Sequence, residues 1–466
     1  MNSYDYIVIG GGPAGEKAAA MAAYFDKKVA IVDDGERPGG TVVSHGGIPT
    51  KTLREAALYL SGFHRREIYG IGVDIAPEVM LDLLRSRADD VTELVAAGVA
   101  ANIERHDIDL LAGRGRIVGP NQVSVTTDEG TETYEAGKVL IATGSRPFRP
   151  PTVPFDDPAV DDSNSILALE SIPGSLVVIG GGPVGVEYAS ITTALGVQVT
   201  LVDAGSRLIP FADAEISEAL RSALESDGAR FIFESPGTEI MRGDGGLEVH
   251  LPSGEILRPD KVLFAAGRAG NTEDLGLDTV GVETDDRNHI IVDGHFQTSV
   301  PWIYAAGDVV GPPALASVSA EQGRIATSHA FDLGVIEQLD QLPVYGVYSI
   351  PEVGMVGLTE AAAIDKGIDT AVGRFGFDRN ARSRISGWGF GMVKLVVDKA
   401  DHKLLGVHIV GDEAAELIHI GQAAIHAGDK VERFIHSTFN TPTRSEAYKY
   451  AAYDALQDIS GRRLSR

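Results

Sequence analysis

The sequence predicts an α/β fold with two Rossmann-like dinucleotide-binding domains, followed by a C-terminal α+β domain. The glycine-rich string Gly10-Gly11-Gly12-Pro13-Ala14-Gly15 recurs almost unchanged at Gly180-Gly181-Gly182-Pro183-Val184-Gly185, and each copy lies between an apolar strand and a helix. From about Pro343 the pattern changes to apolar, β-rich segments. The length of 466 residues fits about three domains of roughly 150 residues each.

Composition limits the class of partner. The 66 acidic residues outnumber the 40 basic ones, and the net charge of -26 opposes binding to nucleic acids and to anionic membrane surfaces. No run approaches the roughly 18 apolar residues of a membrane-spanning helix. Met1-Asn2-Ser3 runs almost directly into an apolar strand, without the pattern of a targeting segment. These features predict a cytoplasmic protein with no nucleic-acid or membrane partner.

The first glycine string lies in a complete βαβ unit. Tyr6-Ile7-Val8-Ile9 predicts a buried strand, Glu16 to Tyr24 predicts an alanine-rich helix, and Val29-Ala30-Ile31-Val32 predicts a second strand that ends at Asp33. Asp33 lies about twenty residues after the glycines, where a carboxylate accepts hydrogen bonds from a ribose.

The glycines of this string have separate roles. Gly10 permits the tight turn, Gly12 lets the backbone approach a pyrophosphate, and Gly15 lets the helix pack close to the strand. The phosphates then lie at the positive end of the helix dipole. The first unit is therefore predicted to bind a dinucleotide.

The second string is embedded in the same way. Leu176-Val177-Val178-Ile179 precedes it, a helix is predicted from Val186 to about Leu195, and a strand over 197–202 ends at Asp203. Two such units in one chain predict two nucleotide sites, one for a tightly held redox cofactor and one for an exchangeable nucleotide.

The segment from Gly39 to Lys51 reads GGTVVSHGGIPTK. It resembles the redox-active helix of the two-dinucleotide-binding flavoprotein reductases, the family of dihydrolipoamide dehydrogenase and glutathione reductase. In that family it reads G-G-T-C-x-x-x-G-C-I-P-(S/T)-K, and the two cysteines form a disulfide that relays electrons from the flavin. Val42 and Gly47 take their places here, and the chain has no cysteine anywhere. The resemblance implies a flavoprotein without dithiol chemistry, and the lack of thiolates leads us to predict no metal site.

Three further segments match the same family in order. Lys138 to Ser145 resembles the strand and A-T-G turn where the first domain passes into the second. Trp302 to Asp308 resembles the Y-A-x-G-D motif, whose aspartate reaches the ribityl chain of the flavin. Ala314-Leu315-Ala316-Ser317 resembles the segment that covers the dimethylbenzene and pyrimidine side of the flavin.

The C-terminal part resembles the interface domain of the family, through which two subunits join as a two-fold dimer. Strands are predicted at 392–397 and 404–410, and a helix from about Ala414 to Ala427. The polar segment 380–388 is predicted to be a loop. The resemblance implies a homodimer with a C-terminal α+β dimerisation domain.

Disulfide reductases of the family carry a histidine-proline-threonine segment and then a glutamate near the C-terminus, which act as acid and base for thiols. Thr441 stands in the place of the histidine here, whereas Glu446 remains. Threonine cannot shuttle a proton near neutral pH as imidazole does. We interpret His436, five residues away, as a surface or interface residue.

The strings IPTKTLREA, GDEAAELIHIGQA and TFNTPTRSEAYKYAAYDAL are most similar to the soluble, FAD-containing pyridine nucleotide transhydrogenases, and this resemblance runs from about residue 4 to residue 458. It implies hydride transfer between NADPH and NAD in a ping-pong cycle at flavin N5, with NAD(H) and NADP(H) as exchangeable substrates. Two alternatives stay open. One is an NAD(P)H dehydrogenase, or diaphorase, that reduces quinones, dyes or oxygen, and the other is a non-catalytic flavoprotein that senses the nicotinamide pool.

The resemblance assigns catalysis to Lys51, beside flavin N5, and to Glu187 as its ion-pair partner. At the second site Asp203 would accept from the adenosine ribose of NAD, and Arg207 would compensate the 2'-phosphate of NADP, so both nucleotides are predicted to bind. Ala266-Gly267-Arg268 resembles the segment of the family that contacts the nicotinamide half.

The expected domains are the first part of an FAD-binding domain (1–150), an NAD(P)-binding domain (151–272), the second, central part of the FAD-binding domain (273–342) and an interface domain (343–466). The residues predicted to hold FAD are Gly10, Gly12, Pro13, Ala14, Gly15, Asp33, Asp34, Gly39, Gly40, Thr41, Lys51, Gly113, Ala142, Thr143, Gly144, Gly307, Asp308, Ala314, Leu315 and Ala316. The residues predicted to hold NAD(P) are Gly180, Gly182, Val184, Gly185, Glu187, Asp203, Arg207 and Gly267.

Overall fold

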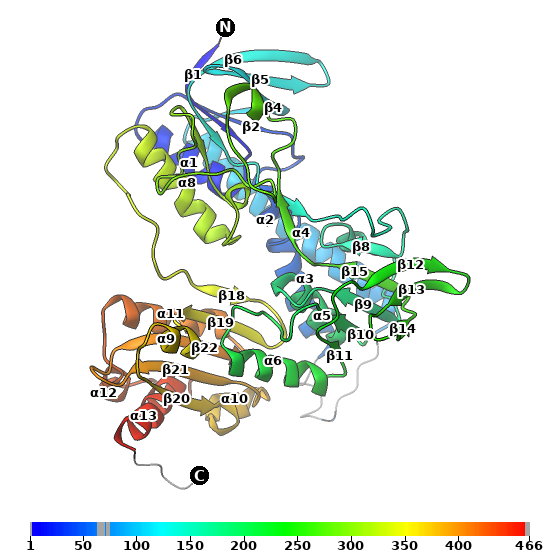
Figure 1. The fold of residues 1–466 in the computed structure, drawn as a ribbon, viewed down its shortest axis with the longest axis vertical. Coiled ribbons are helices and arrows are strands. Elements are labelled where there is room, and N and C mark those ends of the chain that lie inside the picture. Colours follow the sequence, from blue (N-terminus) through cyan, green and yellow to red (C-terminus); the bar gives the residue numbers. More distant parts are fainter. Residues whose placement is uncertain (1, 63–69, 71–74, 462–466) are drawn as a thin grey trace. The chain divides into compact units, whose positions relative to one another are not determined.

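The computed structural model describes residues 2–62, 70 and 75–461 (Figure 1). The chain forms two compact units. Unit 1 consists of Met1–Thr52, Arg85–Phe148 and Gly267–Gln341, and unit 2 consists of Leu53–Leu84, Arg149–Ala266 and Leu342–Arg466. Helices α3 (Ile48–Ser61) and α4 (Pro77–Arg105) each run from one unit into the other. The four domain boundaries expected from the sequence stay a prediction.

Unit 1 is built on a twisted sheet whose central strands are parallel. The strand order is β3-β2-β1-β6-β5-β4, and β17 also pairs with β6. The strands are β1 (Ser3–Ile9), β2 (Val29–Asp33), β3 (Asp109–Ala112), β4 (Arg114–Gly119), β5 (Gln122–Thr127), β6 (Gly130–Ile141) and β17 (Ile303–Ala305), and a separate ribbon pairs β7 (Ser145–Pro147) with β16 (Arg268–Gly270). The remaining elements are α1 (Pro13–Tyr24), α2 (Gly40–Ser44), α7 (Leu277–Val280), η3 (Asp308–Val310) and α8 (Ala316–Ala330).

The core of unit 1 explains why its first residues form strand, turn and helix. Tyr6, Ile7 and Val8 are fully buried, so apolar side chains cover both faces of β1. The buried face of α1 includes Ala18, Ala19 and Ala22, whose small side chains let the helix lie close to its neighbours. Both glycine strings therefore sit where the sequence predicted them, between a buried strand and a helix.

Unit 2 repeats this arrangement in a parallel sheet of order β11-β10-β9-β15-β8. This sheet and its helices form the nucleotide-binding half of unit 2. The elements of this half are β8 (Val160–Asp162), η2 (Ser165–Ala168), β9 (Ser175–Ile179), α5 (Pro183–Ala194), β10 (Gln198–Val202), α6 (Ala214–Ser226), β11 (Arg230–Ile232) and β15 (Lys261–Phe264). A small antiparallel sheet of β12 (Glu239–Gly243), β13 (Gly246–His250) and β14 (Ile256–Leu257) is attached to it.

The C-terminal half of unit 2 is an antiparallel sheet of order β18-β19-β22-β21-β20. Its strands are β18 (Tyr345–Val347), β19 (Glu352–Gly357), β20 (Thr370–Gly376), β21 (Met392–Asp398) and β22 (Leu404–Gly411). Its helices are α9 (Glu360–Asp365), η4 (Phe377–Arg379), α10 (Ala381–Ser386), α11 (Ala414–His426), α12 (Glu432–His436) and α13 (Glu446–Ser460). One apolar cluster joins the two halves, because Ile216 and Leu220 of α6 share it with Met355 and Val410 of the C-terminal sheet.

The prediction of a loop at 380–388 is wrong, because the helix α10 occupies most of this segment. The side chain of Asn380 accepts a hydrogen bond from the backbone N–H of Ser383 at 3.0 Å and caps the helix start. Gly387 ends the helix in the left-handed conformation, at φ 78°. The polar composition was that of a helix with both ends capped.

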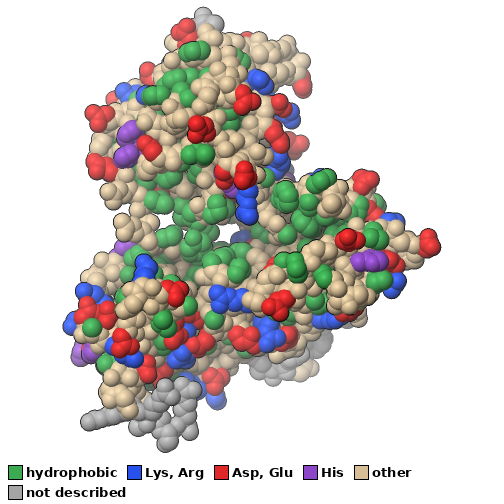
Figure 2. Space-filling model, in the orientation of Figure 1, with side chains coloured by type: hydrophobic (Ala, Val, Ile, Leu, Met, Phe, Trp, Pro, Cys, Tyr) green, Lys and Arg blue, Asp and Glu red, His purple; other side chains and the backbone are tan. Residues whose placement is uncertain are grey.

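Charged side chains lie on the surface of both units. Figure 2 shows acidic side chains scattered over the visible face, with basic ones interspersed.

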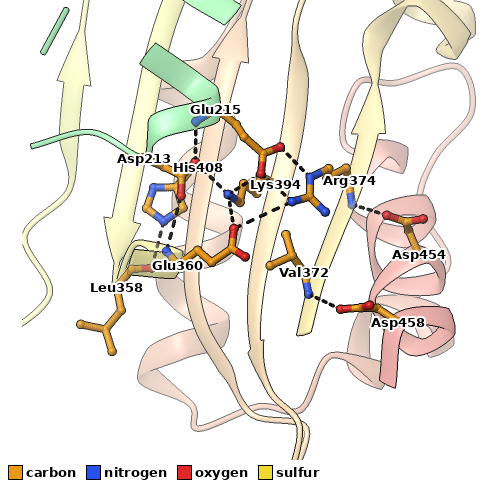
Figure 3. A network of polar contacts seen from close by, with 10 residues as sticks. All are labelled: Asp213, Glu215, Leu358, Glu360, Val372, Arg374, Lys394, His408, Asp454 and Asp458. Carbon is orange, nitrogen blue, oxygen red and sulfur yellow. Dashed lines mark hydrogen bonds and ion pairs between the residues drawn. The ribbon is translucent and has the colours of Figure 1, made fainter. Parts of the chain in front are cut away.

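A buried lysine also ties the two halves of unit 2 together (Figure 3). Lys394 is 1% exposed, and its ammonium nitrogen donates to Asp213 at 2.9 Å, Glu215 at 2.8 Å and Glu360 at 2.8 Å. Arg374 also binds the Glu215 carboxylate, and its Nε donates to Oε2 of Glu215 at 2.6 Å. Asp213 caps the start of α6, so the network connects the nucleotide-binding half with the C-terminal sheet.

We expect this network to weaken in acid. Arg374 and then Lys394 hold the pKa of Glu215 at about 2, below its ordinary 4.5. A lowered pKa gives stability that is present above pH 4.5 and is lost as the pH falls towards 2. Because the Glu215 side chain is 37% exposed, we discount the linkage value for screening and expect Glu215→Gln to cost about 1 kcal/mol at pH 7.

The measurement is thermal unfolding of the wild type, Glu215→Gln and the exposed control Glu239→Gln at pH 7 and pH 3. The difference between wild type and Glu215→Gln should shrink at pH 3. An equal difference at both pH values would contradict the assignment.

Candidate active site

The first glycine turn is closed by contacts that leave no room for side chains. Gly10 has φ 108°, and a Cβ there would lie 2.3 Å from the carbonyl oxygen of Ala142. A Cβ on Gly15 would lie 1.9 Å from the carbonyl oxygen of Gly10. These two glycines are needed by the protein itself, because the turn and the approach of α1 require them.

Gly12 differs, because no contact among the described residues requires glycine there. Its backbone is extended, at φ -71° and ψ -175°, and a Cβ would meet only the Cα of Gly40 at 3.9 Å. Gly182 has the same conformation, at φ -75° and ψ 178°, and a Cβ there would have no neighbour within 4 Å. Both glycines stand at the start of a helix with no side-chain cap, so each leaves space where a phosphate would approach the backbone.

The two strand-terminal aspartates are held in the same way. Asp33 accepts hydrogen bonds from the backbone N–H groups of Gly11 and, at 2.8 Å, of Gly35. Asp203 accepts from Gly181 and, at 2.6 Å, from Gly205. An ionised carboxylate has about four acceptor positions, so each aspartate keeps acceptor capacity for a ribose.

Unit 1 gathers the predicted flavin residues from separate segments around Gly12. The N–H of Gly39 donates to the carbonyl oxygen of Gly11 at 3.1 Å. A Cβ on Gly307 would lie 3.1 Å from the Cβ of Ala14. The N–H of Gly113 donates to the carbonyl oxygen of Asp33 at 2.9 Å, and next to it Arg114 binds the exposed Asp34 at 3.1 Å.

The aspartate of the Y-A-x-G-D motif is fixed by three residues that were not among the predicted site residues. Ser145 donates its hydroxyl to Oδ2 of Asp308 at 2.8 Å. The same hydroxyl accepts from Nε of Arg268 at 2.7 Å, and Ser319 reaches the other oxygen of Asp308 at 3.4 Å. Ser145 directly follows the predicted A-T-G turn, so its place in the sequence was the available signal.

The other predicted residues of unit 1 lie beside these contacts. Thr143 follows Ala142 next to Gly10, and its hydroxyl donates to the carbonyl oxygen of Asn271 at 2.6 Å. The carbonyl oxygen of Gly144 accepts from the N–H of Asn271 at 3.0 Å. Leu315 is the N-cap residue of α8, which begins at Ala316 without a side-chain cap. Four further predicted residues lie in or next to these turns and helix starts: Pro13, Gly40, Thr41 and Ala314.

The segment that carries the disulfide in the family is compact here without sulfur. Val42 lies in α2 and Gly47 directly precedes α3. A Cβ on Gly47 would lie 2.5 Å from the carbonyl oxygen of Val42 and 2.9 Å from its Cα, so the two positions touch. Further on in α3, Nζ of Lys51 donates to the carbonyl oxygen of Gly46 at 3.3 Å and to the hydroxyl of Thr50 at 3.4 Å.

Unit 2 holds the second set of predicted residues. Val184 and Gly185 lie in the first turn of α5, and Glu187 follows on the same helix. Oε1 of Glu187 accepts from the backbone N–H of Tyr348 at 2.9 Å. Arg207 donates to the carbonyl oxygen of Pro210 at 2.5 Å.

Two predictions involve both units. Gly267 falls in unit 1, apart from the other residues predicted for NAD(P). Lys51 belongs to unit 1 and Glu187 to unit 2, so their pairing stays a prediction.

Near the C-terminus Thr441 stands in the place of the family's histidine. Its hydroxyl donates to Oε1 of Glu446 at 2.6 Å, so the glutamate has a neutral partner that cannot act as a base near pH 7. His436 is exposed at the end of α12, in agreement with its interpretation as a surface residue.

Within 2–62, 70 and 75–461, no three histidine, aspartate or glutamate side chains are arranged to hold a metal ion. In the same part of the chain no helix is both long and apolar enough to span a bilayer.

Comparison with known proteins supports the same grouping. The family model of the pyridine nucleotide-disulphide oxidoreductases matches residues 4–323, and the model of the dimerisation domain of these proteins matches residues 344–452. The soluble pyridine nucleotide transhydrogenase of Mycobacterium tuberculosis (strain ATCC 25177 / H37Ra) is 43% identical and is aligned over 98% of each chain. The enzyme of the same name from Marinomonas sp. (strain MWYL1) is 38% identical over 98% of this chain and 99% of its own.

Solved structures share the whole fold. The HOCl-induced flavoprotein disulfide reductase RclA from Escherichia coli has a TM-score of 0.86 at 27% identity, over 96% of this chain and 98% of its own. LpdA from Mycobacterium tuberculosis has a TM-score of 0.87 at 28% identity, over 97% of this chain and 99% of its own. The predicted family and fold class are confirmed. The chain belongs to the pyridine nucleotide-disulphide oxidoreductases and, within them, to the soluble pyridine nucleotide transhydrogenases.

Proposed function

We propose that this protein transfers hydride between NADPH and NAD with FAD as its resident cofactor. The observation that carries the proposal is a pair of helix starts, at Gly12 and Gly182, that leave room for a pyrophosphate in a chain with no cysteine. When bound, FAD accepts hydride from one nicotinamide and returns it to another. Without thiols, nothing in the chain leads electrons onward to a disulfide.

The residues of unit 1 fit FAD. The N-terminus of α1, with Gly12 beside it, would hold the pyrophosphate by its backbone N–H groups and dipole. The spare acceptor positions of Asp33 would hold the adenosine ribose. Asp308, which Ser145 and Arg268 keep in place, would reach the ribityl chain, and the start of α8 at Ala316 would lie against the flavin ring.

The residues of unit 2 fit the exchangeable nucleotides. Gly182 and the start of α5 would hold the pyrophosphate, and Asp203 the adenosine ribose of NAD. Arg207 would turn from the carbonyl oxygen of Pro210 to the 2'-phosphate of NADP, which offsets the repulsion from Asp203. An enzyme that exchanges hydride between the two nucleotides needs this tolerance.

Lys51 and Glu187 are proposed to serve the hydride transfer itself. The Lys51 ammonium would stabilise negative charge that develops beside it, because a fixed charge in a water-poor site costs no reorganisation during the reaction. Glu187 would hold this ammonium in place. Gly267 is proposed to contact the nicotinamide half by its backbone.

The test is a steady-state assay with purified protein, NADPH and an NAD analogue whose reduced form absorbs at its own wavelength. We expect fast transfer with nucleotides alone and parallel-line, ping-pong kinetics. Turnover only when a quinone, a dye or oxygen is added would favour the dehydrogenase alternative. No turnover with any acceptor, from protein that contains FAD, would favour the sensor alternative.

We predict no reduction of lipoamide or glutathione disulfide above a free-flavin control, because Val42, Gly47 and Thr441 replace the thiols and the base. The double variant Val42→Cys/Gly47→Cys should stay inactive too, since a Cβ at residue 47 would meet the carbonyl oxygen of Val42 at 2.5 Å and Thr441 is still not a base. NADH-dependent disulfide reduction by either protein would refute the prediction.

We further propose a homodimer formed through the C-terminal sheet domain. In the single chain Ile385 is 63%, Tyr450 46% and Tyr453 45% exposed, and apolar surface of this kind marks interfaces. Sedimentation at micromolar concentration should give about twice the 49.2 kDa chain mass. A monomer would contradict the proposal.

We place the enzyme in the cytoplasm without a nucleic-acid partner. The proposed substrates are intracellular nucleotides, and the net charge of -26 repels polyanions.

A further inference from the structure

The turn between β18 and β19, residues 348–351, lies against Glu187. The backbone N–H of Tyr348 donates to Oε1 of Glu187 at 2.9 Å. Glu187 is 8% exposed, and a hydrogen bond to a buried carboxylate is strong and directional. The position in which the turn holds this backbone N–H therefore helps to fix the orientation of the carboxylate.

Arg54 also holds this turn. Arg54 lies in α3 and is 4% exposed. Its Nε donates to the carbonyl oxygen of Ser349 at 3.0 Å, and its Nη2 contacts Oε1 of Glu352 at 3.1 Å. One guanidinium thus binds both Ser349, the second residue of the turn, and Glu352, the first residue of β19. Ser349 directly follows Tyr348, whose backbone N–H donates to Glu187.

Glu352, the partner of Arg54, is itself held in place. It is 8% exposed, and its second oxygen accepts from the backbone N–H of Ala415, in the first turn of α11, at 3.0 Å. Burial raises the pKa of Glu352, and the charge of Arg54 opposes this rise. A buried ion pair adds little net stability compared with apolar side chains of the same size, so geometry is what this pair supplies.

We propose that Arg54 and Glu352 are a positioning pair for Glu187, which fix the 348–351 turn so that the Tyr348 N–H orients the Glu187 carboxylate for hydride transfer. The inference rests on the proposed function, in which Glu187 holds the ammonium of Lys51. Neither Arg54 nor Glu352 contacts Glu187 in the hydrogen bonds and ion pairs of the described residues. They act on it through the backbone of Tyr348.

The test uses three changes in the FAD-loaded protein. Glu352→Gln removes the charge of the carboxylate but keeps its shape. Arg54→Lys keeps the positive charge but lacks the planar fork by which Nε and Nη2 reach two acceptors in fixed directions. The double variant Arg54→Met/Glu352→Leu removes the buried charges together, which is often neutral for folding. Tyr448→Phe is the matched control, because it removes buried hydrogen bonds to the carbonyl oxygen of Leu417 and from the backbone N–H of Gly421, elsewhere in unit 2.

Two readouts are combined. The first is hydrogen exchange of the Tyr348 amide, which reports local opening of the turn. The second is kcat for NADPH to NAD transfer, with KM for each nucleotide. In both single variants and in the double variant we expect faster exchange at Tyr348 and a fall in kcat on the order of tenfold with little change in KM. Tyr448→Phe should leave both readouts unchanged.

The double variant separates positioning from folding. Its melting temperature should be close to that of the wild type, and its kcat should still be low. If the pair were merely structural, a double variant of restored stability would also have a restored kcat. Unchanged exchange at Tyr348 in Glu352→Gln and the double variant, or full kcat in the stable double variant, would overturn the inference. A wild type that transfers no hydride between nucleotides would instead refute the proposed function, and the exchange measurement would still show whether the pair holds the turn.

Discussion

A Gly182→Val variant should fold and stay yellow but lose most of its affinity for both NAD and NADP. The backbone of Gly182 is extended, and a Cβ there has no protein neighbour within 4 Å, so the fold accepts a side chain. The branched side chain would fill the space left for the pyrophosphate at the start of α5. We expect KM for NADPH and NAD to rise about 100-fold, which corresponds to roughly 2.7 kcal/mol.

The measurement is steady-state transfer together with the flavin absorbance and the melting temperature of the variant. Gly185→Val is the contrasting change, because a Cβ there would lie 1.9 Å from the carbonyl oxygen of Gly180 and should prevent unit 2 from folding normally. Normal KM values in a folded Gly182→Val protein would place the nucleotide elsewhere.

Lys51→Met should retain FAD and slow hydride transfer at least tenfold in both directions. FAD stays bound because the contacts proposed for its phosphates and ribose lie at Gly12, Asp33 and Asp308. The rate falls because one preorganised charge is lost, and tenfold corresponds to about 1.4 kcal/mol of barrier. The same microscopic step runs forward and backward, so oxidation of NADPH and reduction of NAD should slow in parallel.

Stopped-flow measurement of the two half-reactions is the test, with Lys51→Arg as the control that keeps a positive charge. Unchanged rates in Lys51→Met would make the lysine structural. Slow oxidation of NADPH combined with normal turnover of a dye or quinone would favour the dehydrogenase alternative.

The part of the site that the sequence predicted best is the part made of local turns. Gly10, Gly15 and the aspartates at the strand ends have roles set within some twenty-five residues of chain. Their spacing therefore carried the information that the structure shows in the approach of Gly15 to Gly10 and in the amide contacts of Asp33 and Asp203.

The missed features depend on residues distant in the sequence. Arg54 meets a turn almost 300 positions later, and Lys394 joins three carboxylates from different elements. No periodicity or motif links such residues, because their proximity follows from packing of the finished fold. The helix at 381–386 was missed for a local reason, since its polar face and terminal glycine resemble a loop.

The apolar cluster that runs from Ile216 and Leu220 to Met355 and Val410 has a consequence for exchanging parts between relatives. Residues 149–266 are continuous along the chain and resemble a module that a recombination could transplant alone. Their apolar inner surface is instead complementary to one C-terminal sheet, and their carboxylates Asp213 and Glu215 must match the charge of Lys394 in that sheet. A transplanted nucleotide-binding half would therefore have to bring the C-terminal sheet of its own parent with it.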